Sequence, residues 1–526
     1  MKGRVSPLQK IRFGTDGWRA VIADEFTVSN VRGVTRAVAS FLEEEGREAA
    51  GVVIGYDNRF LAEEFAAQAA AVFMDKGIKV YLCRRPAPTP AVAFAVKHLK
   101  TAGAVMFTAS HNPYRYQGIK FIPHYAGPAL PQETDRIGEL VQLSLEEEGG
   151  EKGACSGFFR KQLEMLRELL HNPDNEEYPE NQETETRAKT ETPAKNESGS
   201  TPEGSGKKLL EVIEPEGPYL KHLEGIIDRE AIAASPPFLV LDSMHGAGIG
   251  YLEAFLLPLG CRVEVIRGFR DPFFGGALPD PSRGNLQKLR SLVLEMQADA
   301  GLALDGDGDR LGIIGPEGEY LSANEILTLF LEYLVQHKKL GGVVARTVAT
   351  THNLDRLADF YNLRLVETPV GFKYIGRVMR EEDVFLGGEE SGGISIRGHI
   401  PEKDGIMASL LFVEMLSATG ASPKELYSRI GEKIELLSFE RLDINILSAS
   451  KEKALERLQS WEPERLAGVK VEKISRLDGV KILLEGGSWC LVRASGTENV
   501  FRIYLEAPDR GLFQELQNEI REELGI

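Results

Sequence analysis

The chain has 526 residues, of which 42% are hydrophobic and 27% charged, and its formal net charge is −17. This length exceeds one ordinary core and predicts several domains, and the composition is that of a globular protein rather than a fibrous or disordered one. No run approaches the ~18 apolar residues that cross a bilayer, and the negative charge argues against a protein that coats nucleic acid. We therefore expect no membrane partner and no nucleic-acid partner.

The N-terminal sequence and the cysteines indicate a compartment. The first residues, MKGRVSPLQK, lack the apolar segment of a secretion signal. The cysteines are far apart and show no spacing typical of metal ligands, so we expect separate thiols in a reducing environment. They are Cys83, Cys155, Cys261 and Cys490. The prediction is a cytoplasmic protein.

Short apolar runs alternate with longer helical patterns along most of the chain, as at Val52–Gly55, Phe238–Leu241 and Val343–Ala345. This alternation predicts α/β domains, in which polar residues just beyond the C-terminal ends of strands line the ligand crevice. The C-terminal section instead predicts an α+β unit, with strands near Val480–Leu484 and Phe501–Glu506 ahead of a terminal helix.

The motif TASHNP, residues 108–113, follows the apolar run Ala102–Phe107. Ser110 lacks the G-x-S-x-G flanks of a serine hydrolase, which disfavours acyl transfer. A serine that carries a phosphoryl group needs a cation for the charge and a donor or acceptor for the proton, and His111 and Lys120 are candidates in the same turn and strand. The alternative is a hydroxyl that only caps a turn or a helix.

One segment differs from the rest of the chain. Residues 171–208 contain no Ile, Leu, Val, Phe, Met or Trp, so this segment cannot bury a core, and we predict a disordered polar insertion without a catalytic role. The predicted domains are 1–170, 209–315, 316–433 and 434–526.

Two glycine-containing motifs follow. HGAGIG has glycines spaced G-x-G-x-G, which is not the dinucleotide fingerprint, so we predict a tight strand-to-helix turn. DGDGDR places Asp305, Asp307 and Asp309 on one side of an extended chain, and its glycines let the backbone curl so that the carboxylates converge. These carboxylates would repel one another, and a hard divalent cation such as Mg²⁺ relieves that repulsion.

DGDGDR has two alternative interpretations. An EF-hand loop requires glycine at its sixth position and glutamate at its twelfth, and this chain has Arg310 and Pro316 there. An exposed acidic turn is the second alternative, and the strand-end context favours a metal site over it.

The third α/β section carries candidate sugar contacts. In GEESGG, Glu389 and Ser391 lie on a glycine-flanked loop after an apolar run, where a carboxylate could accept from sugar hydroxyls, although a solvated turn fits about as well. Lys373 in TPVGFKYIG is a further candidate. Lys403 and Asp404 in HIPEKDG lie nearby, and a lone lysine is usually a solvated surface residue.

The last motif, RASGTENVFRIYLEA, predicts a phosphate site. It combines hydroxyls, free backbone N–H groups and two guanidiniums, and a guanidinium matches phosphate oxygens in bidentate geometry. The candidate residues are Arg493, Ser495, Gly496, Thr497 and Arg502. A surface turn with incidental arginines is the alternative.

Taken in order, FGTDGWRA, TASHNP with GIK, DGDGDR, GEESGG and RASGTE resemble the motifs of the α-D-phosphohexomutase superfamily, specifically its bacterial phosphoglucomutase/phosphomannomutase branch. The resemblance covers nearly the whole chain, and five ordered motifs make it highly specific. It implies three similar α/β domains with mixed sheets and a smaller C-terminal α+β domain around a central cleft.

The resemblance also implies residue roles. Ser110 would be phosphorylated, and one Mg²⁺ per chain would be held by the three aspartates of DGDGDR with a Ser110 phosphate oxygen. Arg19, His111 and Lys120 would serve the transfer, with Lys120 the better general acid/base candidate. Arg310 would steady the phosphate. Glu389, Ser391 and Lys373 would contact the sugar. The other phosphate would be held by Arg493, Ser495, Gly496, Thr497 and Arg502.

The implied activity interconverts hexose 1-phosphate and hexose 6-phosphate through phosphoserine and a bisphosphorylated sugar, with glucose 1,6-bisphosphate as activator and intermediate. Gly393 stands where mannose-tolerant relatives often have histidine, and Phe372–Lys373 where some have Gly-His; both favour glucose, with mannose next. Alternatives are a phosphoglucosamine mutase, a Mg²⁺-dependent sugar phosphatase and a silent sugar-phosphate binder. The chain could act as a monomer or a homodimer.

Overall fold

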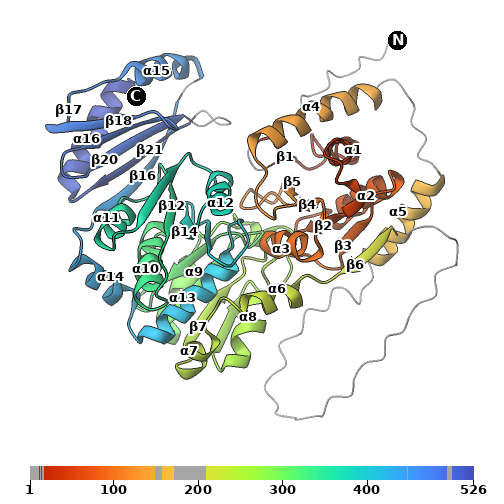
Figure 1. Ribbon diagram of the computed structural model, residues 1–526, viewed down its shortest axis with the longest axis horizontal. Coiled ribbons are helices and arrows are strands. Elements are labelled where there is room, and N and C mark those ends of the chain that lie inside the picture. The colour runs from red at the N-terminus through yellow and green to blue at the C-terminus, as the bar shows by residue number, and fades with distance from the viewer. Residues whose placement is uncertain are drawn as a thin grey trace.

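The described part of the chain contains four β-sheets, each covered by helices (Figure 1). The computed structural model describes residues 11, 13–14, 17–148, 157–170, 209–446, 448–494 and 500–525. The first and the fourth domain lie at the two ends of the molecule, and the second and third lie between them (Figure 1). The predicted insertion 171–208 and Cys155 lie outside the described residues.

The first sheet is mixed. Its inner strands β2, β3 and β4 run parallel, whereas β5 runs antiparallel to β4, and β1 antiparallel to β5. The sheet order is β1 (Trp18–Val21), β5 (Tyr116–Pro123), β4 (Gly103–Phe107), β2 (Val52–Tyr56), β3 (Val80–Cys83) and β6 (Leu210–Ile213). Its helices are α1 (Val28–Glu44), α2 (Ala62–Asp75), α3 (Thr89–Leu99), α4 (Pro131–Glu148) and α5 (Gly157–Leu170).

The second sheet repeats this pattern with fewer strands, because β7, β8 and β9 are parallel and β10 returns antiparallel to β9. The sheet order is β11 (Tyr320–Leu321), β10 (Leu311–Ile314), β9 (Ala300–Leu304), β7 (Phe238–Asp242) and β8 (Arg262–Ile266). Its helices are α6 (Glu216–Leu223), α7 (Arg229–Ala234), α8 (Tyr251–Leu256) and α9 (Gln287–Met296). The predicted strand-to-helix turn of HGAGIG lies between β7 and α8.

The third sheet is the smallest, with β12, β13 and β14 parallel and β15 antiparallel to β14. The sheet order is β13 (Arg364–Thr368), β12 (Val343–Thr347), β14 (Val384–Gly388) and β15 (Ile394–Ile396). Its helices are α10 (Ala323–Gln336), α11 (Asn353–Phe360), α12 (Phe372–Glu381), α13 (Gly405–Thr419) and α14 (Pro423–Gly431). Helix α10 begins with a capping box, in which Ser322 and Glu325 satisfy each other's backbone N–H groups.

The fourth domain differs, because all its strand pairs are antiparallel. The sheet order is β16 (Ser438–Asn445), β21 (Val500–Ala507), β20 (Trp489–Ala494), β19 (Val480–Leu484), β18 (Val469–Ser475) and β17 (Arg465–Leu466). Its helices are α15 (Ser448–Ser460) and α16 (Arg510–Leu524). The predicted fold class, three α/β domains with mixed sheets and a C-terminal α+β domain, is confirmed.

The sheets do not change at the predicted domain boundaries. Strand β6 pairs in parallel with β3 of the first sheet, although it follows residue 209. Strand β11 pairs with β10 of the second sheet, although it follows residue 316. Strand pairing does not depend on chain order, so a strand that follows a long polar segment can still complete an earlier sheet edge. The proposed division of the chain therefore needs the boundaries at residues 209 and 316 a few residues later.

Three motif loops occupy equivalent places in the first three sheets. In each sheet one parallel strand is followed along the chain by an antiparallel neighbour: β4 by β5, β9 by β10 and β14 by β15. The connecting loops contain TASHNP, DGDGDR and GEESGG respectively. Because β4, β9 and β14 are parallel strands, each loop begins at the C-terminal edge of a sheet, where ligands of α/β proteins bind.

The largest hydrophobic cluster joins the first three domains, and the fourth domain has a core of its own. One continuous cluster of buried side chains extends through the first three domains, from Ile11 to Ile434. A separate cluster, from Ile446 to Leu524, fills the fourth domain between its sheet and its helices. The third and fourth domains meet at a smaller apolar cluster, formed by Val348, Ala349, Trp489, Leu491 and Tyr504.

The contact between these two domains also contains a buried polar network around Lys481. Its Nζ donates to Val348 O at 2.7 Å, and it lies 2.8 Å from His352 Nε2 and 2.9 Å from Glu367 Oε2. Burial lowers the pKa of Lys481 to about 8. The fourth domain thus places a weakly basic ammonium group into the third.

We expect this network to make stability depend on pH. The pKa of Lys481 is lower in the folded chain than its ordinary value of 10.5, so the buried ammonium costs stability below pH ~8, and this cost is relieved as the pH rises toward that ordinary value. The unfolding free energy of the wild type minus that of Lys481→Met should increase by about 1–3 kcal/mol between pH ~7 and ~10.

Denaturant unfolding at each pH measures that difference, with the exposed Lys470→Met variant as control. A wild-type minus Lys481→Met difference that stays constant over this range would contradict the expectation.

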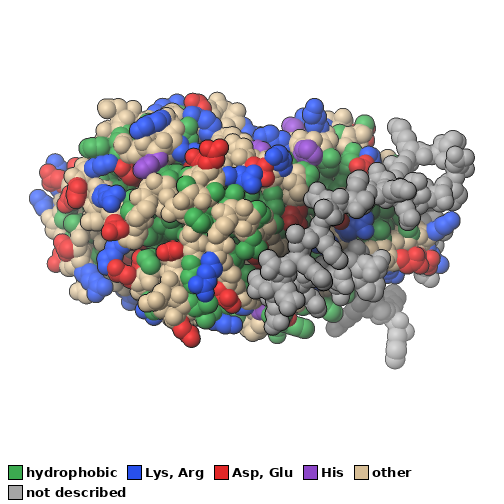
Figure 2. Space-filling model, turned by 90° about the horizontal axis from the view of Figure 1, so that it is seen from below, with side chains coloured by type: hydrophobic (Ala, Val, Ile, Leu, Met, Phe, Trp, Pro, Cys, Tyr) green, Lys and Arg blue, Asp and Glu red, His purple; other side chains and the backbone are tan. Residues whose placement is uncertain are grey.

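Among the described helices, none alone is long and apolar enough to span a membrane; α13 and α14 pass that test only as a pair bent by 78°. On the face shown in Figure 2, acidic and basic side chains are interspersed rather than gathered by sign.

Candidate active site

Ser110 lies in the loop between β4 and β5, in a strained backbone conformation. Its φ is 49°, in the left-handed region that non-glycine residues rarely adopt. The side chain of Thr108 accepts from its N–H at 2.8 Å. Its hydroxyl donates to Asp305 Oδ2 at 2.9 Å and lies 3.3 Å from His111 Nδ1. The backbone therefore directs the Ser110 hydroxyl toward the acidic loop of the second domain.

The DGDGDR loop between β9 and β10 is folded around its carboxylates. Asp305, Asp307 and Asp309 are all 0% exposed, and one ligand atom from each lies within 4.8 Å of the others. The backbone N–H groups of Asp309 and Arg310 donate to Asp305 Oδ1 at 2.9 and 3.0 Å. Gly308, with φ of 70°, provides the left-handed turn that the loop requires.

Two lysines contact the acidic loop from other domains. Lys120 Nζ, on β5, donates to Asp307 Oδ2 at 2.6 Å and to Asp309 Oδ2 at 3.0 Å. Lys403 Nζ, before α13, lies 2.9 Å from Asp309 Oδ2. The first, second and third domains therefore each contribute charges to one buried cluster.

The donor set fits a divalent cation. Oδ1 of Asp307 and Oδ1 of Asp309 are buried and accept no hydrogen bond from any described residue. A buried carboxylate oxygen without a partner is costly. A cluster that offers only oxygen ligands suits a hard cation such as Mg²⁺, and these three aspartates are placed so that they could hold one.

Burial and the charges of the cluster shift the pKa values of two of its carboxyl groups. Burial, and then the charges of Asp309 and Asp307, hold the pKa of Asp305 well above its usual value. Burial acts in the same direction on Asp307, but the neighbouring Lys120 and Lys403 charges outweigh it and hold the pKa of Asp307 well below the usual range. Asp307 is thus firmly kept as an anion.

The remaining candidates of the first two domains lie around the Ser110 hydroxyl. The positive charge of Arg310, followed by burial, lowers the pKa of His111 to about 2, so its imidazole is neutral. Arg19, on β1, donates through Nη1 to Asn112 Oδ1 at 2.9 Å. Arg310 Nε lies 3.9 Å from Asp309 Oδ1. The structure therefore brings these cationic side chains to the same loop pair.

The GEESGG loop lies against this cluster. Glu389 Oε1 accepts from the Gly371 N–H at 3.0 Å, and Glu389 contributes to the charge around Arg310. A Cβ on Gly393 would lie 2.9 Å from Lys403 Cδ and 3.0 Å from Glu389 Oε2. Lys373 is buried in the first turn of α12, and Ser391 is half-buried. The absence of a side chain at position 393 thus makes room for Lys403.

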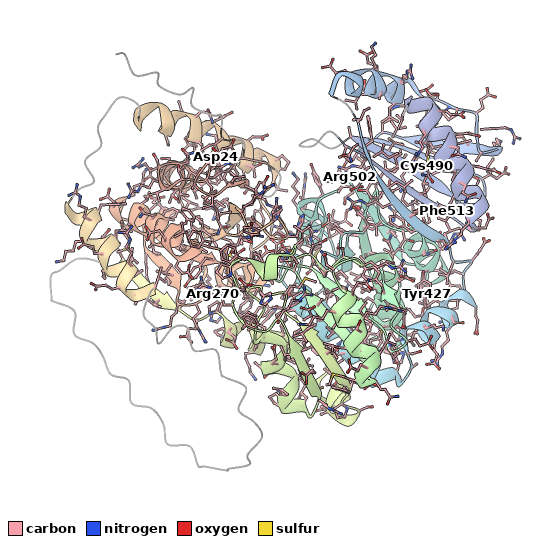
Figure 3. The ribbon with its side chains drawn as sticks, turned by 180° about the vertical axis from the view of Figure 1, so that it is seen from behind. Asp24, Arg270, Tyr427, Cys490, Arg502 and Phe513 are labelled. Carbon is pink, nitrogen blue, oxygen red and sulfur yellow. The ribbon has the colours of Figure 1, made fainter. Side chains whose placement is uncertain are left out.

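The fourth domain presents two of its predicted phosphate ligands, Arg493 and Arg502, which face each other across β20 and β21. Arg502 lies at the edge of this domain that faces the rest of the chain (Figure 3). Arg493 Nη2 and the Val370 N–H both donate to Asp478 Oδ2, at 2.8 and 2.9 Å. Arg493 is thereby linked to the segment next to Gly371. Ser495, Gly496 and Thr497 lie outside the described residues.

Two site residues have roles that the sequence did not indicate. Lys403, expected as a solvated surface lysine, is buried, because Asp309 and Glu402 supply the negative charge that holds it inside; that expectation was wrong. Thr89, at the start of α3, donates to Asp307 Oδ2 at 2.6 Å. Asp404, which follows Lys403, caps α13, and this helix start is the one local pattern that could have placed Lys403 in an ordered segment. No local pattern marks Thr89.

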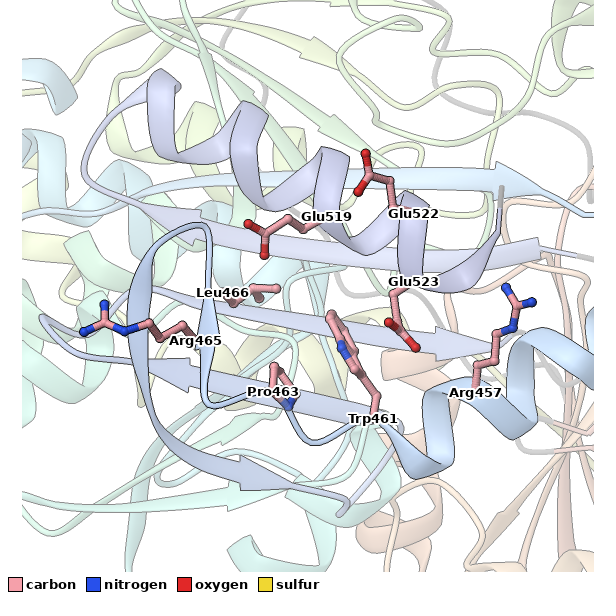
Figure 4. A pocket seen from close by; sticks show the side chains of 8 residues that line it. All are labelled: Arg457, Trp461, Pro463, Arg465, Leu466, Glu519, Glu522 and Glu523. Carbon is pink, nitrogen blue, oxygen red and sulfur yellow. The ribbon is translucent and has the colours of Figure 1, made fainter.

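A concavity lies on the fourth domain, lined by residues of α15, of β17 and the segment that leads to it, and of α16 (Figure 4). Its volume is about 490 Å³. It mixes three carboxylates with two guanidiniums around an indole. Its lining residues are Arg457, Trp461, Pro463, Arg465, Leu466, Glu519, Glu522 and Glu523.

Comparison with protein families gives four consecutive matches. Residues 10–147, 217–318 and 322–433 match the phosphoglucomutase/phosphomannomutase alpha/beta/alpha domains I, II and III. Residues 446–523 match the C-terminal domain of the same family. The matched ranges include every described motif loop.

Similar proteins carry more than one substrate name. A phosphoglucomutase/phosphomannomutase of Thermococcus kodakarensis is 28% identical over 94% of both chains. A phosphoglucosamine mutase of Campylobacter curvus is 26% identical over 97% of both chains. A solved structure from Thermus thermophilus, assigned as a phosphomannomutase, is 32% identical, covers 98% of this chain and 100% of its own, and superposes with a TM-score of 0.76.

Proposed function

Because the chain belongs to the phosphoglucomutase/phosphomannomutase family of the α-D-phosphohexomutase superfamily, isomerases that transfer phosphate within one molecule, we propose that it interconverts hexose 1-phosphate and hexose 6-phosphate. The proposed preference is glucose, with mannose accepted less well. The reaction passes through phosphorylated Ser110 and a sugar bisphosphate, so glucose 1,6-bisphosphate is both intermediate and activator.

The observation that carries this proposal is the contact between the Ser110 hydroxyl and Asp305, which joins two domains at 2.9 Å. A serine hydroxyl aimed at a buried acidic cluster is a poor acyl nucleophile. The ring of His111 lies 3.3 Å from it, but no third group among the described residues hydrogen-bonds to that ring and orients it as a base. It is well placed to carry a phosphoryl group, because cations and oxygen ligands for a metal surround it.

In the forward half-reaction the bond between phosphorus and Ser110 Oγ breaks, and a bond between phosphorus and a free sugar hydroxyl forms. The sugar hydroxyl loses a proton and Ser110 Oγ gains one. Lys120 is the proposed proton carrier. Burial lowers the pKa of its ammonium, but the charges of Asp307 and Asp309 outweigh burial and raise it, so Lys120 is protonated and would donate a proton to Ser110 Oγ, while its amine takes the proton of the sugar hydroxyl. Neutral His111 and the Arg19 guanidinium would orient the phosphoryl group. In the second half-reaction the other phosphate of the sugar returns to Ser110.

Asp305, Asp307 and Asp309 would hold one Mg²⁺, and the cation when bound neutralises phosphate charge during transfer. The orphaned carboxylate oxygens of Asp307 and Asp309 support this assignment. Arg310, adjoining the loop, would steady the same phosphate.

Recognition of the sugar is assigned to the third and fourth domains. Glu389, Ser391 and Lys373 would contact the sugar, and Arg493 and Arg502, with Ser495, Gly496 and Thr497, would hold the phosphate that is not being transferred. The link from Arg493 through Asp478 to Val370 supports a shared cavity, because it places this arginine beside the segment that binds Glu389.

The test of this function is intact-mass measurement after incubation with glucose 1,6-bisphosphate and Mg²⁺. We expect one phosphoryl group on the chain and conversion of glucose 1-phosphate to glucose 6-phosphate. Release of free phosphate from hexose phosphates without isomerisation would instead indicate the phosphatase. Values of kcat/KM for the 1-phosphates of glucose, mannose and glucosamine decide the substrate, and a highest value for glucosamine would overturn the glucose preference.

We expect Gly393→Ala to lower kcat/KM for glucose 1-phosphate about tenfold. The added Cβ would meet Lys403 Cδ at 2.9 Å and Glu389 Oε2 at 3.0 Å, and displacing either group misplaces a contact of the sugar or of the acidic loop. Steady-state kinetics measure the effect. Gly217→Ala is the control, because its Cβ would meet nothing within 4 Å. Equal kcat/KM in both variants would contradict this account of position 393.

A further inference from the structure

Three consecutive residues after β2, Asp57, Asn58 and Arg59, are fully buried, although all are polar. The Asp57 N–H continues the sheet by donating to Phe107 O at 2.9 Å, at the end of β4. These residues lie next to β4, the strand that leads to Ser110, so their polar side chains need partners inside the protein.

Arg59 holds the Ser110 loop by its carbonyl oxygens. Its Nη2 donates to Ser110 O at 2.6 Å and Asn112 O at 2.7 Å, and its Nη1 donates to Pro113 O and Tyr116 O, both at 3.0 Å. With Nε bound to Asp57, all five donors of the guanidinium are used. The loop from Ser110 to Tyr116 is therefore shaped around one side chain.

Asp57 keeps Arg59 charged and fixed. Its Oδ2 accepts from Arg59 Nε at 3.1 Å, and its Oδ1 accepts from the Arg59 N–H at 3.0 Å. The guanidinium also lies 4.9 Å from the centre of the Phe274 ring, in the second domain. A buried ion pair is retained at a cost in desolvation unless its remaining hydrogen bonds are satisfied, and here the loop carbonyls satisfy them.

Asn58 extends the same arrangement to the second domain. Both hydrogens of its Nδ2 are donated there, to His245 O at 2.9 Å and to Gly246 O at 2.8 Å. The next residue, Ala247, donates its N–H to Gly306 O at 3.0 Å, inside the acidic loop. The turn of HGAGIG thus transmits the position of Asn58 to DGDGDR.

The two loops also meet without space between them. A Cβ on Gly306 would lie 2.6 Å from Ser110 O, the carbonyl that Arg59 binds. A Cβ on Gly246 would lie 2.8 Å from Gly306 O. The loops therefore pack backbone to backbone, and a shift of either one changes the distance from the Ser110 hydroxyl to Asp305.

We propose that Asn58 and Arg59 are positioning residues for phosphoryl transfer: Arg59 holds Ser110 in its left-handed conformation, and Asn58 fixes the acidic loop relative to it. This inference rests on the proposed function. Neither side chain needs to touch the sugar. Each acts through the separation and direction of the Ser110 hydroxyl, where a displacement of about 1 Å can cost on the order of 100-fold in rate.

The test compares Arg59→Lys with Arg346→Lys. Both arginines are buried and ion-paired, but Arg346 lies on β12 and binds Asp355 and Glu367. Lysine keeps the charge and loses the planar fork. We expect Arg59→Lys to lower kcat about 100-fold with KM changed less than about threefold, and Arg346→Lys to lose stability without this selective fall in kcat. Asn58→Asp, which turns a carboxylate toward two carbonyls, should also lower kcat.

Two further measurements separate positioning from folding. Hydrogen exchange of the amides in residues 108–116 should be about tenfold faster in Arg59→Lys and unchanged in Arg346→Lys. Guanidinium at millimolar concentration should restore part of the kcat of Arg59→Ala and none of that of Arg346→Ala. If Arg59→Ala does not fold, Arg59→Lys and Asn58→Asp decide.

A wild-type kcat in Arg59→Lys and Asn58→Asp, or parallel losses in the Arg59 and Arg346 variants, would overturn the inference. A wild type that neither takes phosphate from glucose 1,6-bisphosphate nor isomerises hexose phosphates would refute the proposed function instead, and hydrogen exchange in the loop would still judge the role of Arg59.

Discussion

Ser110→Ala is expected to lower hexose phosphate isomerisation by about 10⁴-fold or more, because it removes the atom that carries the phosphoryl group in the proposed reaction. The variant should also take up no phosphate from glucose 1,6-bisphosphate, as measured by intact mass. Folding should be nearly unchanged, because the hydroxyl is lost while the Ser110 N–H and C=O keep their bonds to Thr108 and Arg59.

Ser422→Ala provides the matched control. It removes a hydroxyl that caps α14, so it should cost about 1 kcal/mol of stability and leave both phosphate uptake and isomerisation at the wild-type level. If Ser110→Ala still became phosphorylated, another residue would be the phosphate carrier and the proposed mechanism would be wrong.

Asp307→Asn is expected to lower kcat by about 100- to 1,000-fold and to abolish stabilisation by Mg²⁺. Asp307 is the aspartate that Lys120 and Lys403 keep ionised, and its Oδ1 is one of the two buried oxygens without a hydrogen-bond partner among the described residues of this loop. An amide supplies a weaker ligand and leaves Lys120 with one carboxylate fewer. Kinetics and melting temperature, each with Mg²⁺ and with EDTA, measure the two effects.

The control for this substitution is Asp228→Asn, which makes the same chemical change at the N-cap of α7. Asparagine caps a helix as well as aspartate does, so activity and the response to Mg²⁺ should stay at wild-type values. A melting temperature that rises equally with Mg²⁺ in wild type and Asp307→Asn would place the cation elsewhere.

The parts of the site that the sequence predicts are those whose residues are consecutive. Asp305, Asp307 and Asp309 are separated by single glycines, so a converging oxygen cluster can be recognised before any fold is known. Ser110 could be recognised because it follows a buried apolar run, and strand ends in α/β sheets meet at a common edge. The family motifs then supplied the order of the domains.

Other parts depend on contacts between distant segments. Arg59 reaches the carbonyl of Ser110 across 51 positions, and main-chain acceptors leave no trace in the sequence. Lys403 looks like a surface lysine until the fold places Asp309 beside it. Strand β6 joins β3 only because the chain returns after residue 208. These features arise from tertiary packing, which overrides local patterns.

Ser110 is held at three of its atoms by three different segments: its amide by Thr108, its carbonyl by Arg59 and its hydroxyl by Asp305. The bonds of the amide and the carbonyl do not involve the hydroxyl, so in the proposed reaction they would remain when Oγ carries the phosphoryl group and would keep Ser110 in place during both half-reactions. In the proposed reaction the sugar bisphosphate therefore has to reorient while Ser110 keeps its position. The intermediate must break its contacts with the protein, reverse its two ends and bind again before it dissociates. Turnover would then depend on the rate at which the intermediate is released and rebound, and not on a movement of the serine.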